Sequence, residues 1–165
     1  MPLKTALIGE LKNESSMTQK ILEKVPLDKK DWRPHEKSMT VGRLATHIAQ
    51  IPHWISDIIN EAEYDFATRP YVSNTAVSQE ELMQIFREKL DGAIKDLESV
   101  EDEALEQKWS VRSGEQIYFT LPKKIAIRSW GFSHLFHHRG QLSVYLRLLD
   151  VPVPGMYGPS ADEKM

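Results

Sequence analysis

The sequence predicts an all-α protein built as a four-helix bundle, in one domain that spans residues 1–165. Two observations support this prediction. Apolar residues recur at three- and four-residue steps in four long segments, which is the period of a helix that buries one face. With 41% hydrophobic and 27% charged residues, the chain has enough apolar material for one core of ordinary size. Four amphipathic helices in one such domain favour a bundle.

The first two helices are defined by their leucine and isoleucine patterns. The first is expected over residues 3–24, before a proline-containing loop. Thr40 is suited to begin the second helix, because its hydroxyl can accept a backbone N–H of the first turn. That helix carries aliphatic residues on one face as far as Ile58. It also contains Pro52, which should bend it because proline removes a backbone donor and crowds the preceding turn.

The second half of the chain predicts two more helices with an extended excursion between them. Ser78 and Glu81 form a capping box for a third helix that ends near Val100. The stretch KWSVRSGEQIYFTLP then contains two short runs rich in β-branched and aromatic residues, separated by a Ser-Gly-Glu turn. This pattern predicts a short β-hairpin. Pro122 should open the fourth and longest helix, over about residues 122–149.

Composition excludes several classes of function. The chain has no cysteine, so disulfides, thiolate metal sites and a cysteine nucleophile are excluded. The net charge is -3, and the charges alternate without the clustered Lys and Arg that nucleic-acid binding requires. No apolar run approaches the roughly 18–20 residues of a membrane span, and the first residues lack the apolar run of a signal peptide. We therefore expect a cytoplasmic protein that binds neither nucleic acid nor membrane.

Three of the six histidines lie in the segment SHLFHHRGQ of the fourth predicted helix. His134 and His138 are four residues apart, so their side chains share one helix face and can reach the same ion. His137 lies about 60° from His134 around the helix, and could replace one ligand or hydrogen-bond to one. Neutral imidazole is a good ligand for zinc, nickel, copper or iron. The alternative is a pair of hydrogen-bonded helix residues that bind no metal.

An open metal site usually has three protein ligands, so a third ligand must come from another element. His47 is the best candidate, because it lies in the second helix at the edge of the apolar stripe. His53 faces another side of that helix, and His35 lies in a proline-flanked loop. By helical phase, we expect six side chains to line a pocket around the site: Gln50, Trp54, Trp130, His137, Gln141 and Tyr145.

Four further polar residues are interpreted as structural. Arg139 and Arg147 are expected in solvent or in salt bridges rather than on a substrate. Tyr157, in the proline- and glycine-rich tail, is expected to anchor that tail by packing. Glu14 lies near the apolar stripe of the first helix, and a partly exposed carboxylate is expected there rather than an acid in the pocket.

Three segments together resemble the DinB family of metalloenzymes, which is distinct from the DNA polymerase of the same name. The segments are WRPHEKSMTVGRLATHIAQ, HHRGQLSVYLR and VPGMYGPSADE, and they occur in the family's order over nearly the whole chain. The resemblance implies an up-down-down-up four-helix bundle with a divalent metal, nickel or zinc, held by three histidines. The positions that match the family's ligands are His47, His134 and His138, whereas His137 is not expected to be a ligand.

The resemblance also implies a function. The better-characterised members are thiol-dependent transferases or isomerases that use a low-molecular-weight thiol, and many members are homodimers. Because this chain has no cysteine, the thiol must come with the substrate, and a metal could lower its pKa. We therefore expect a metal-dependent S-transferase that acts on a small molecule. The alternatives are a metal-dependent hydrolase, in which the metal activates water, and a non-catalytic metal-binding stress-response protein.

Overall fold

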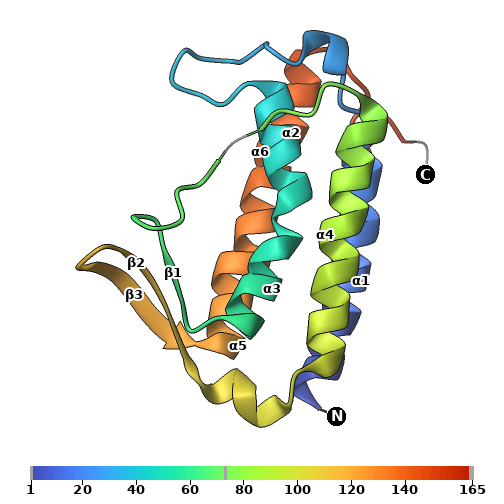
Figure 1. Ribbon diagram of the computed structural model, residues 1–165. Helices are drawn as coiled ribbons and strands as arrows, with labels where there is room; N and C mark the ends of the chain where they lie inside the picture. Colours follow the sequence, from blue (N-terminus) through green and yellow to red (C-terminus); the bar gives the residue numbers. More distant parts are fainter. Residues whose placement is uncertain (1, 73, 164–165) are drawn as a thin grey trace.

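The computed structural model describes residues 2–72 and 74–163, and it is mostly helical with a small three-stranded sheet (Figure 1). The longer helices are α1 (Leu3–Leu22), α2 (Val41–Gln50), α3 (Pro52–Asn60), α4 (Gln79–Ser99) and α6 (His134–Leu148). The shorter ones are the 3₁₀ turns Leu27–Lys29 and Asp102–Glu106, α5 (Lys123–Ala126) and a π-helical segment, Ile127–Ser133. Within the described ranges, none of these helices combines the length and the apolar character needed to cross a membrane.

The longer helices lie lengthwise against one another around one apolar core (Figure 1). α4 packs against α1, α2 and α3, and α6 packs against α1 and α2. The largest fully buried side chains in this core are aromatic: Phe86, Trp109 and Phe132. The amphipathic patterns in the sequence therefore become the buried faces of packed helices.

The predicted helix starts are confirmed by their caps. Thr40 Oγ1 accepts the N–H of Arg43 at 3.3 Å, and Ser78 Oγ accepts the N–H of Glu81 at 3.1 Å. Pro52 divides the second predicted helix into α2 and α3 and occupies the first turn of α3. A proline fits there because its missing N–H would have no partner inside that helix.

The fourth predicted helix is interrupted in its first half. It begins as α5, widens into the π-helical segment Ile127–Ser133 and then continues as α6. The chain packs closely here, since a Cβ on Gly131 would lie 3.1 Å from Cγ1 of Ile55. π-helical turns rotate the residues before them relative to those after them, and they often occur at functional sites. The 100° step of an α-helix therefore does not relate the side-chain directions before this segment to those after it, whereas it does hold within α6.

The predicted hairpin is wrong as a description of the extended region, because the sheet is mixed. β2 (Lys108–Ser113) pairs antiparallel with β3 (Gln116–Pro122), and β1 (Glu63–Asp65) pairs parallel with β2. Strand β1 is only three residues long, too short to show a β pattern in the sequence. It is fixed by the Asp65 carboxylate, which accepts N–H groups from Ala67 at 2.9 Å and Gly114 at 3.0 Å.

Candidate metal centre and adjoining pocket

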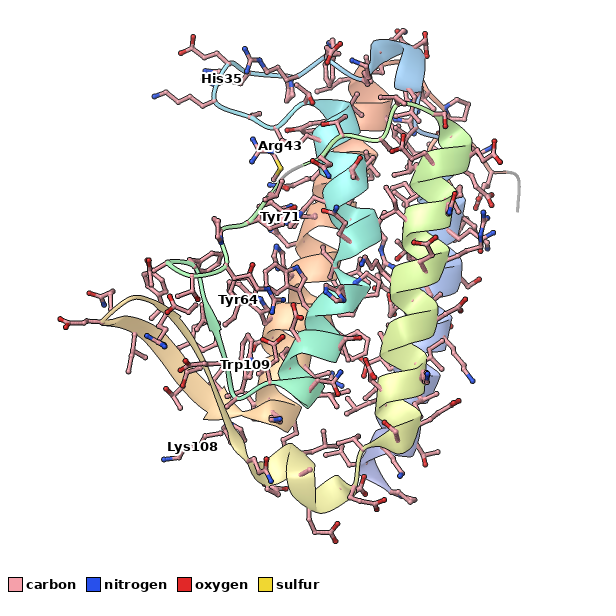
Figure 2. The ribbon with its side chains drawn as sticks, viewed as in Figure 1. His35, Arg43, Tyr64, Tyr71, Lys108 and Trp109 are labelled. Carbon is pink, nitrogen blue, oxygen red and sulfur yellow. The ribbon has the colours of Figure 1, made fainter. Side chains whose placement is uncertain are left out.

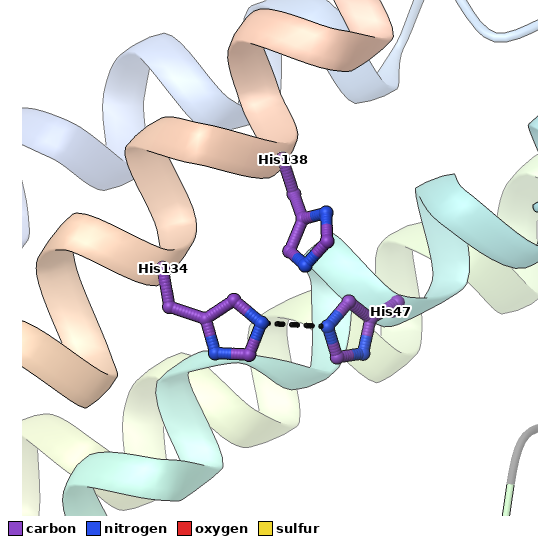
Figure 3. Close-up of side chains that lie close together, drawn as sticks. All are labelled: His47, His134 and His138. Carbon is purple, nitrogen blue, oxygen red and sulfur yellow. Dashed lines mark hydrogen bonds between the residues drawn. The ribbon is translucent and has the colours of Figure 1, made fainter.

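Three histidines from two helices converge between α2 and α6 (Figure 3). They are His47 on α2 and His134 and His138 on α6, and their ligand nitrogens all lie within 4.8 Å of one another. The ring centroids of His138 lie 4.6 Å from those of His47 and 4.7 Å from those of His134. This group could hold a divalent metal ion, because the three nitrogen donors approach one point.

Gln141 sets the tautomer of His138. Its Oε1 lies 2.7 Å from Nδ1 of His138, one turn earlier on α6. An amide oxygen only accepts hydrogen bonds, so Nδ1 of His138 carries the ring proton. The lone pair of a neutral imidazole then lies on Nε2, which faces the other two histidines.

Tyr71 and Gln50 set the tautomer of His47 in the same way. The Tyr71 hydroxyl donates to Oε1 of Gln50 at 3.2 Å and lies 2.7 Å from Nδ1 of His47. Because its own hydrogen is used on Gln50, this hydroxyl accepts the Nδ1–H of His47. His47 therefore also presents an unprotonated Nε2, which lies 3.1 Å from Nε2 of His134. This contact is a hydrogen bond when Nε2 of His134 carries the ring proton, and a metal ion bound between the rings would take the place of that proton.

The surroundings keep the three imidazoles neutral. Burial, with smaller contributions from the charges of His138, His134 and Arg43, lowers the pKa of His47 to about 3. Burial also lowers the pKa of His134 to about 4, helped by His138 and opposed in part by the backbone of Trp130. The pKa of His138 is lowered by burial as well. Neutral imidazole is the form that binds a metal, so the group is prepared for one at neutral pH.

The other three histidines lie outside this group. His137 is exposed, and its ring centroid is 4.9 Å from that of His138. His53 is exposed on α3, 3.6 Å from the carboxylate of Asp57. His35 is exposed in the loop before α2 (Figure 2). None of them is among the converging nitrogens.

A pocket of about 230 Å³ adjoins the histidine group. It is bounded by α3, by α4 and by the segment that follows β1, in which Tyr71 lies (Figure 2). Its lining residues are aromatic and polar: Gln50, His53, Trp54, Asp57, Tyr64, Arg69, Pro70, Tyr71, Val72 and Lys89. Tyr71 belongs to both places, because it lines the pocket and its hydroxyl contacts His47.

Two of the six expected pocket residues line this pocket. Gln50 and Trp54 line the pocket described above. Trp130 lies in the π-helical segment. Its ring centroid is 5.7 Å from that of Trp54, which lines the pocket, and 5.5 Å from that of His134, so it contacts both the pocket wall and the histidine group. Its role in binding stays a prediction.

The residues expected on α6 lie elsewhere. Gln141 contacts His138 rather than the pocket, and His137 faces solvent. Tyr145 packs edge-on against Trp32 with ring centroids 5.7 Å apart. The helical periodicity of the sequence could not identify three other pocket residues. Arg69 and Tyr71 come from an irregular segment, and Lys89 comes from the polar side of α4. A sequence signal for them would have needed the path of the chain after β1.

A buried ion pair joins α6 to α1 directly beside the histidines. Arg139 follows His138 in the chain and donates to Oε2 of Glu14 at 2.5 Å, to the Glu14 carbonyl at 3.0 Å and to Thr18 at 3.1 Å. Arg139 is in a salt bridge, as expected, but the partly exposed carboxylate predicted at Glu14 is wrong. Glu14 is 6% exposed, because Arg139 covers it from the neighbouring helix.

The tail is held by hydrogen bonds at Tyr157 and at Asp162. The Tyr157 hydroxyl donates to Glu14 at 2.8 Å and also contacts Arg139. Tyr157 is 70% exposed, so it anchors the tail by its hydroxyl rather than by packing. Further along, Asp162 pairs with Arg147 at 2.6 Å, which confirms the salt bridge expected for that arginine.

Comparisons with known proteins agree with this architecture. The model of the DinB family matches residues 1–164. The Bacillus subtilis (strain 168) protein called "Uncharacterized protein YjoA" is 22% identical over 144 residues, which cover 86% of this chain and 87% of that protein. The crystal structure of a DinB-like protein from Bacillus cereus ATCC 10987 has a TM-score of 0.69 and 24% identity, covering 92% of this chain and 95% of that one.

The crystal structure of the DinB-like protein YjoA from Bacillus subtilis also has a TM-score of 0.69, at 17% identity, and covers 97% of this chain and 99% of that one. Similarity at these identities shows the fold, whereas the family match extends over nearly the whole sequence. We therefore conclude that the chain belongs to the DinB family.

Proposed function

We propose that this protein is a metal-dependent enzyme that acts on a small molecule, with a nickel or zinc ion held by His47, His134 and His138. The observation that supports this most is the 3.1 Å approach of the Nε2 atoms of His47 and His134. The hydrogen bonds to Nδ1 of His47 leave its Nε2 unprotonated, and it is this Nε2 that faces His134. A cation bound between the rings would replace the proton of this hydrogen bond and use all three nitrogen donors.

The donor set fits such an ion. Three neutral imidazoles suit zinc and nickel, and a site with three protein ligands leaves coordination positions open for substrate. When bound, the metal would act as a Lewis acid that lowers the pKa of a thiol or a water molecule. Tyr71 and Gln141 hold the ligand rings in the required tautomer, and burial keeps those rings free of protons at neutral pH.

We propose transfer of a low-molecular-weight thiol as the reaction. The absence of cysteine requires that the thiol be a co-substrate, and membership in the DinB family makes this chemistry the first to test. The adjoining pocket favours an enzyme over a non-catalytic metal-binding stress-response protein, because binding a metal alone needs no second binding space. Metal-dependent hydrolysis is the competing reaction at the same centre.

Four coarser expectations belong to the same proposal. They are one domain, an up-down-down-up order of the helices in a four-helix bundle, a homodimer and a cytoplasmic location. The oligomeric state can be checked on the metal-loaded protein by size-exclusion chromatography with light scattering.

The metal centre is tested by measuring the metal content of purified variants after loading with zinc or nickel. We expect about one ion per chain in the unaltered protein and strong loss in His47→Ala, His134→Ala and His138→Ala. The matched control is His137→Ala, which removes an exposed imidazole from the same helix and should keep the ion. Full metal content in the three ligand variants would show that the site is wrong.

The reaction is tested separately with the loaded protein, a panel of small thiols and an electrophilic acceptor such as 1-chloro-2,4-dinitrobenzene. We expect conjugation faster than with the thiol alone, and loss of that acceleration in His138→Ala. Bound metal without acceleration for any thiol would overturn the transferase and leave hydrolysis to be tested with ester and amide substrates.

A further inference from the structure

We infer that the pocket beside the histidine group binds a small organic anion with a single aromatic ring, and that Lys89 neutralises its charge. The inference rests on the proposed function only in naming this anion as part of the substrate. Binding itself depends on the pocket residues and does not require the metal.

The walls of the pocket are suited to an aromatic ring. Trp54 is 6% exposed, and its ring centroid lies 4.9 Å from that of Tyr64 and 6.3 Å from that of Tyr71. Such a cluster offers both faces and edges to another ring, which are the favoured geometries of aromatic contact. The volume of about 230 Å³ lies below the ~300 Å³ at which pockets for drug-sized ligands begin, so one ring fits better than two.

The charged groups in the pocket are already paired, with one exception. Arg69 binds Asp57 at 2.6 Å and Glu61 at 2.7 Å, and its guanidinium lies 4.4 Å from the centre of the Tyr64 ring. Lys89 lines the same pocket from α4. Among the residues that the structure describes, no carboxylate lies within salt-bridge distance of its ammonium. It is therefore the cation that can receive an anionic group of a ligand.

The position of Tyr71 connects this pocket to the histidine group. Its side chain forms one wall of the pocket, and its hydroxyl lies 2.7 Å from Nδ1 of His47. A ligand in the pocket would thus be separated from the metal ligands by one side chain. In a transfer reaction whose thiol binds at the metal, the reacting group of the acceptor would have to extend past Tyr71 to reach the thiol.

Binding can be measured by titrating full-length protein, as purified and after metal removal, with phenylacetate while following tryptophan fluorescence and calorimetry. Phenylacetate has about 10 heavy atoms, for which we expect a Kd on the order of 1 mM. Phenylacetamide, which is neutral, should bind at least about tenfold more weakly, because it cannot pair with the ammonium. Benzylphosphonate tests whether the site prefers a phosphate-type head group, and acetate tests whether the ring is needed.

The variant Lys89→Met should weaken phenylacetate binding by at least about tenfold, whereas Lys89→Arg should retain most of it. Lys95→Met is the matched control, because Lys95 is exposed on the same helix and lies outside the pocket lining. The inference would be overturned if neither phenylacetate nor benzylphosphonate bound saturably. It would also be overturned if phenylacetamide bound as tightly as phenylacetate, or if Lys89→Met bound phenylacetate as tightly as the unaltered protein. Since the titration includes metal-free protein, its failure is distinct from a failure of the metal centre.

Discussion

Replacing Glu14 with leucine should destabilise the fold strongly, because it leaves the guanidinium of Arg139 buried without its carboxylate. Arg139 is 2% exposed, and its contacts with Glu14 comprise a 2.5 Å ion pair and a 3.0 Å hydrogen bond to the backbone carbonyl. The backbone contact and the bond to Thr18 would remain, so the loss is that of one partner of a buried pair. Such a loss costs about 3–5 kcal/mol.

In a chain of 165 residues, each kcal/mol corresponds to a shift of about 2–4 °C in Tm, so we expect Tm to fall by roughly 6–20 °C. The assay is thermal unfolding followed by circular dichroism, supported by urea unfolding at 25 °C. Arg139→Met alone should also destabilise, because it leaves the Glu14 carboxylate buried with only the Tyr157 hydroxyl.

The double variant Glu14→Leu/Arg139→Met separates pairing from other effects. We expect it to be more stable than Glu14→Leu, because two apolar side chains of similar size leave no unpaired charge behind. A Glu14→Leu variant within about 1 kcal/mol of the unaltered protein would refute the reasoning. The same conclusion would follow if the two single losses were simply additive in the double variant.

Three further predictions concern the histidine group. Removing metal with a chelator should lower Tm by about 5–11 °C if the ion is present at about 100 times its Kd, since linkage then contributes ~2.7 kcal/mol; an unchanged Tm would indicate that no metal binds the folded state. In metal-free protein, the folded-state pKa values of His47 and His134, about 3 and about 4, lie below the unfolded value of 6.5, so the unfolded chain takes up protons first. Their contribution to stability is therefore complete above pH ~6.5 and is lost as the pH falls toward 4 and then 3, which urea unfolding between pH 4 and pH 8 can follow. Tyr71→Phe should lower metal affinity by about tenfold in a chelator competition, because it removes the hydroxyl that fixes His47, whereas Tyr145→Phe should leave it unchanged.

The parts of the site that the sequence could predict depend on local geometry. The spacing of His134 and His138 places them on one face of any α-helix, whatever surrounds it. The position of His47 followed from the apolar stripe of a single helix, and Thr40 and Ser78 cap their helices through backbone N–H groups three residues away. Each of these predictions needed only the period of a helix or the hydrogen-bonding capacity of one side chain.

The parts that could not be predicted depend on contacts between distant segments. Glu14 is buried because Arg139, 125 residues later, contacts it from the neighbouring helix α6. β1 exists because it pairs with β2, 47 residues further along when Glu63 and Ser110 are compared. Tyr71 reaches His47 from an irregular segment whose path has no periodic signal. The π-helical turn before His134 also removed the basis for assigning Trp130 by phase.

Anomalous diffraction from crystals of the metal-loaded protein would show most directly whether three Nε2 atoms bind one ion. Data collected at the absorption edge of the loaded metal would locate the ion and identify its ligands. We predict one anomalous peak per chain, bonded at about 2.0–2.1 Å to Nε2 of His47, His134 and His138. A peak bound through Nδ1 atoms or through His137, or loaded crystals with no peak between α2 and α6, would contradict a site formed by these three histidines.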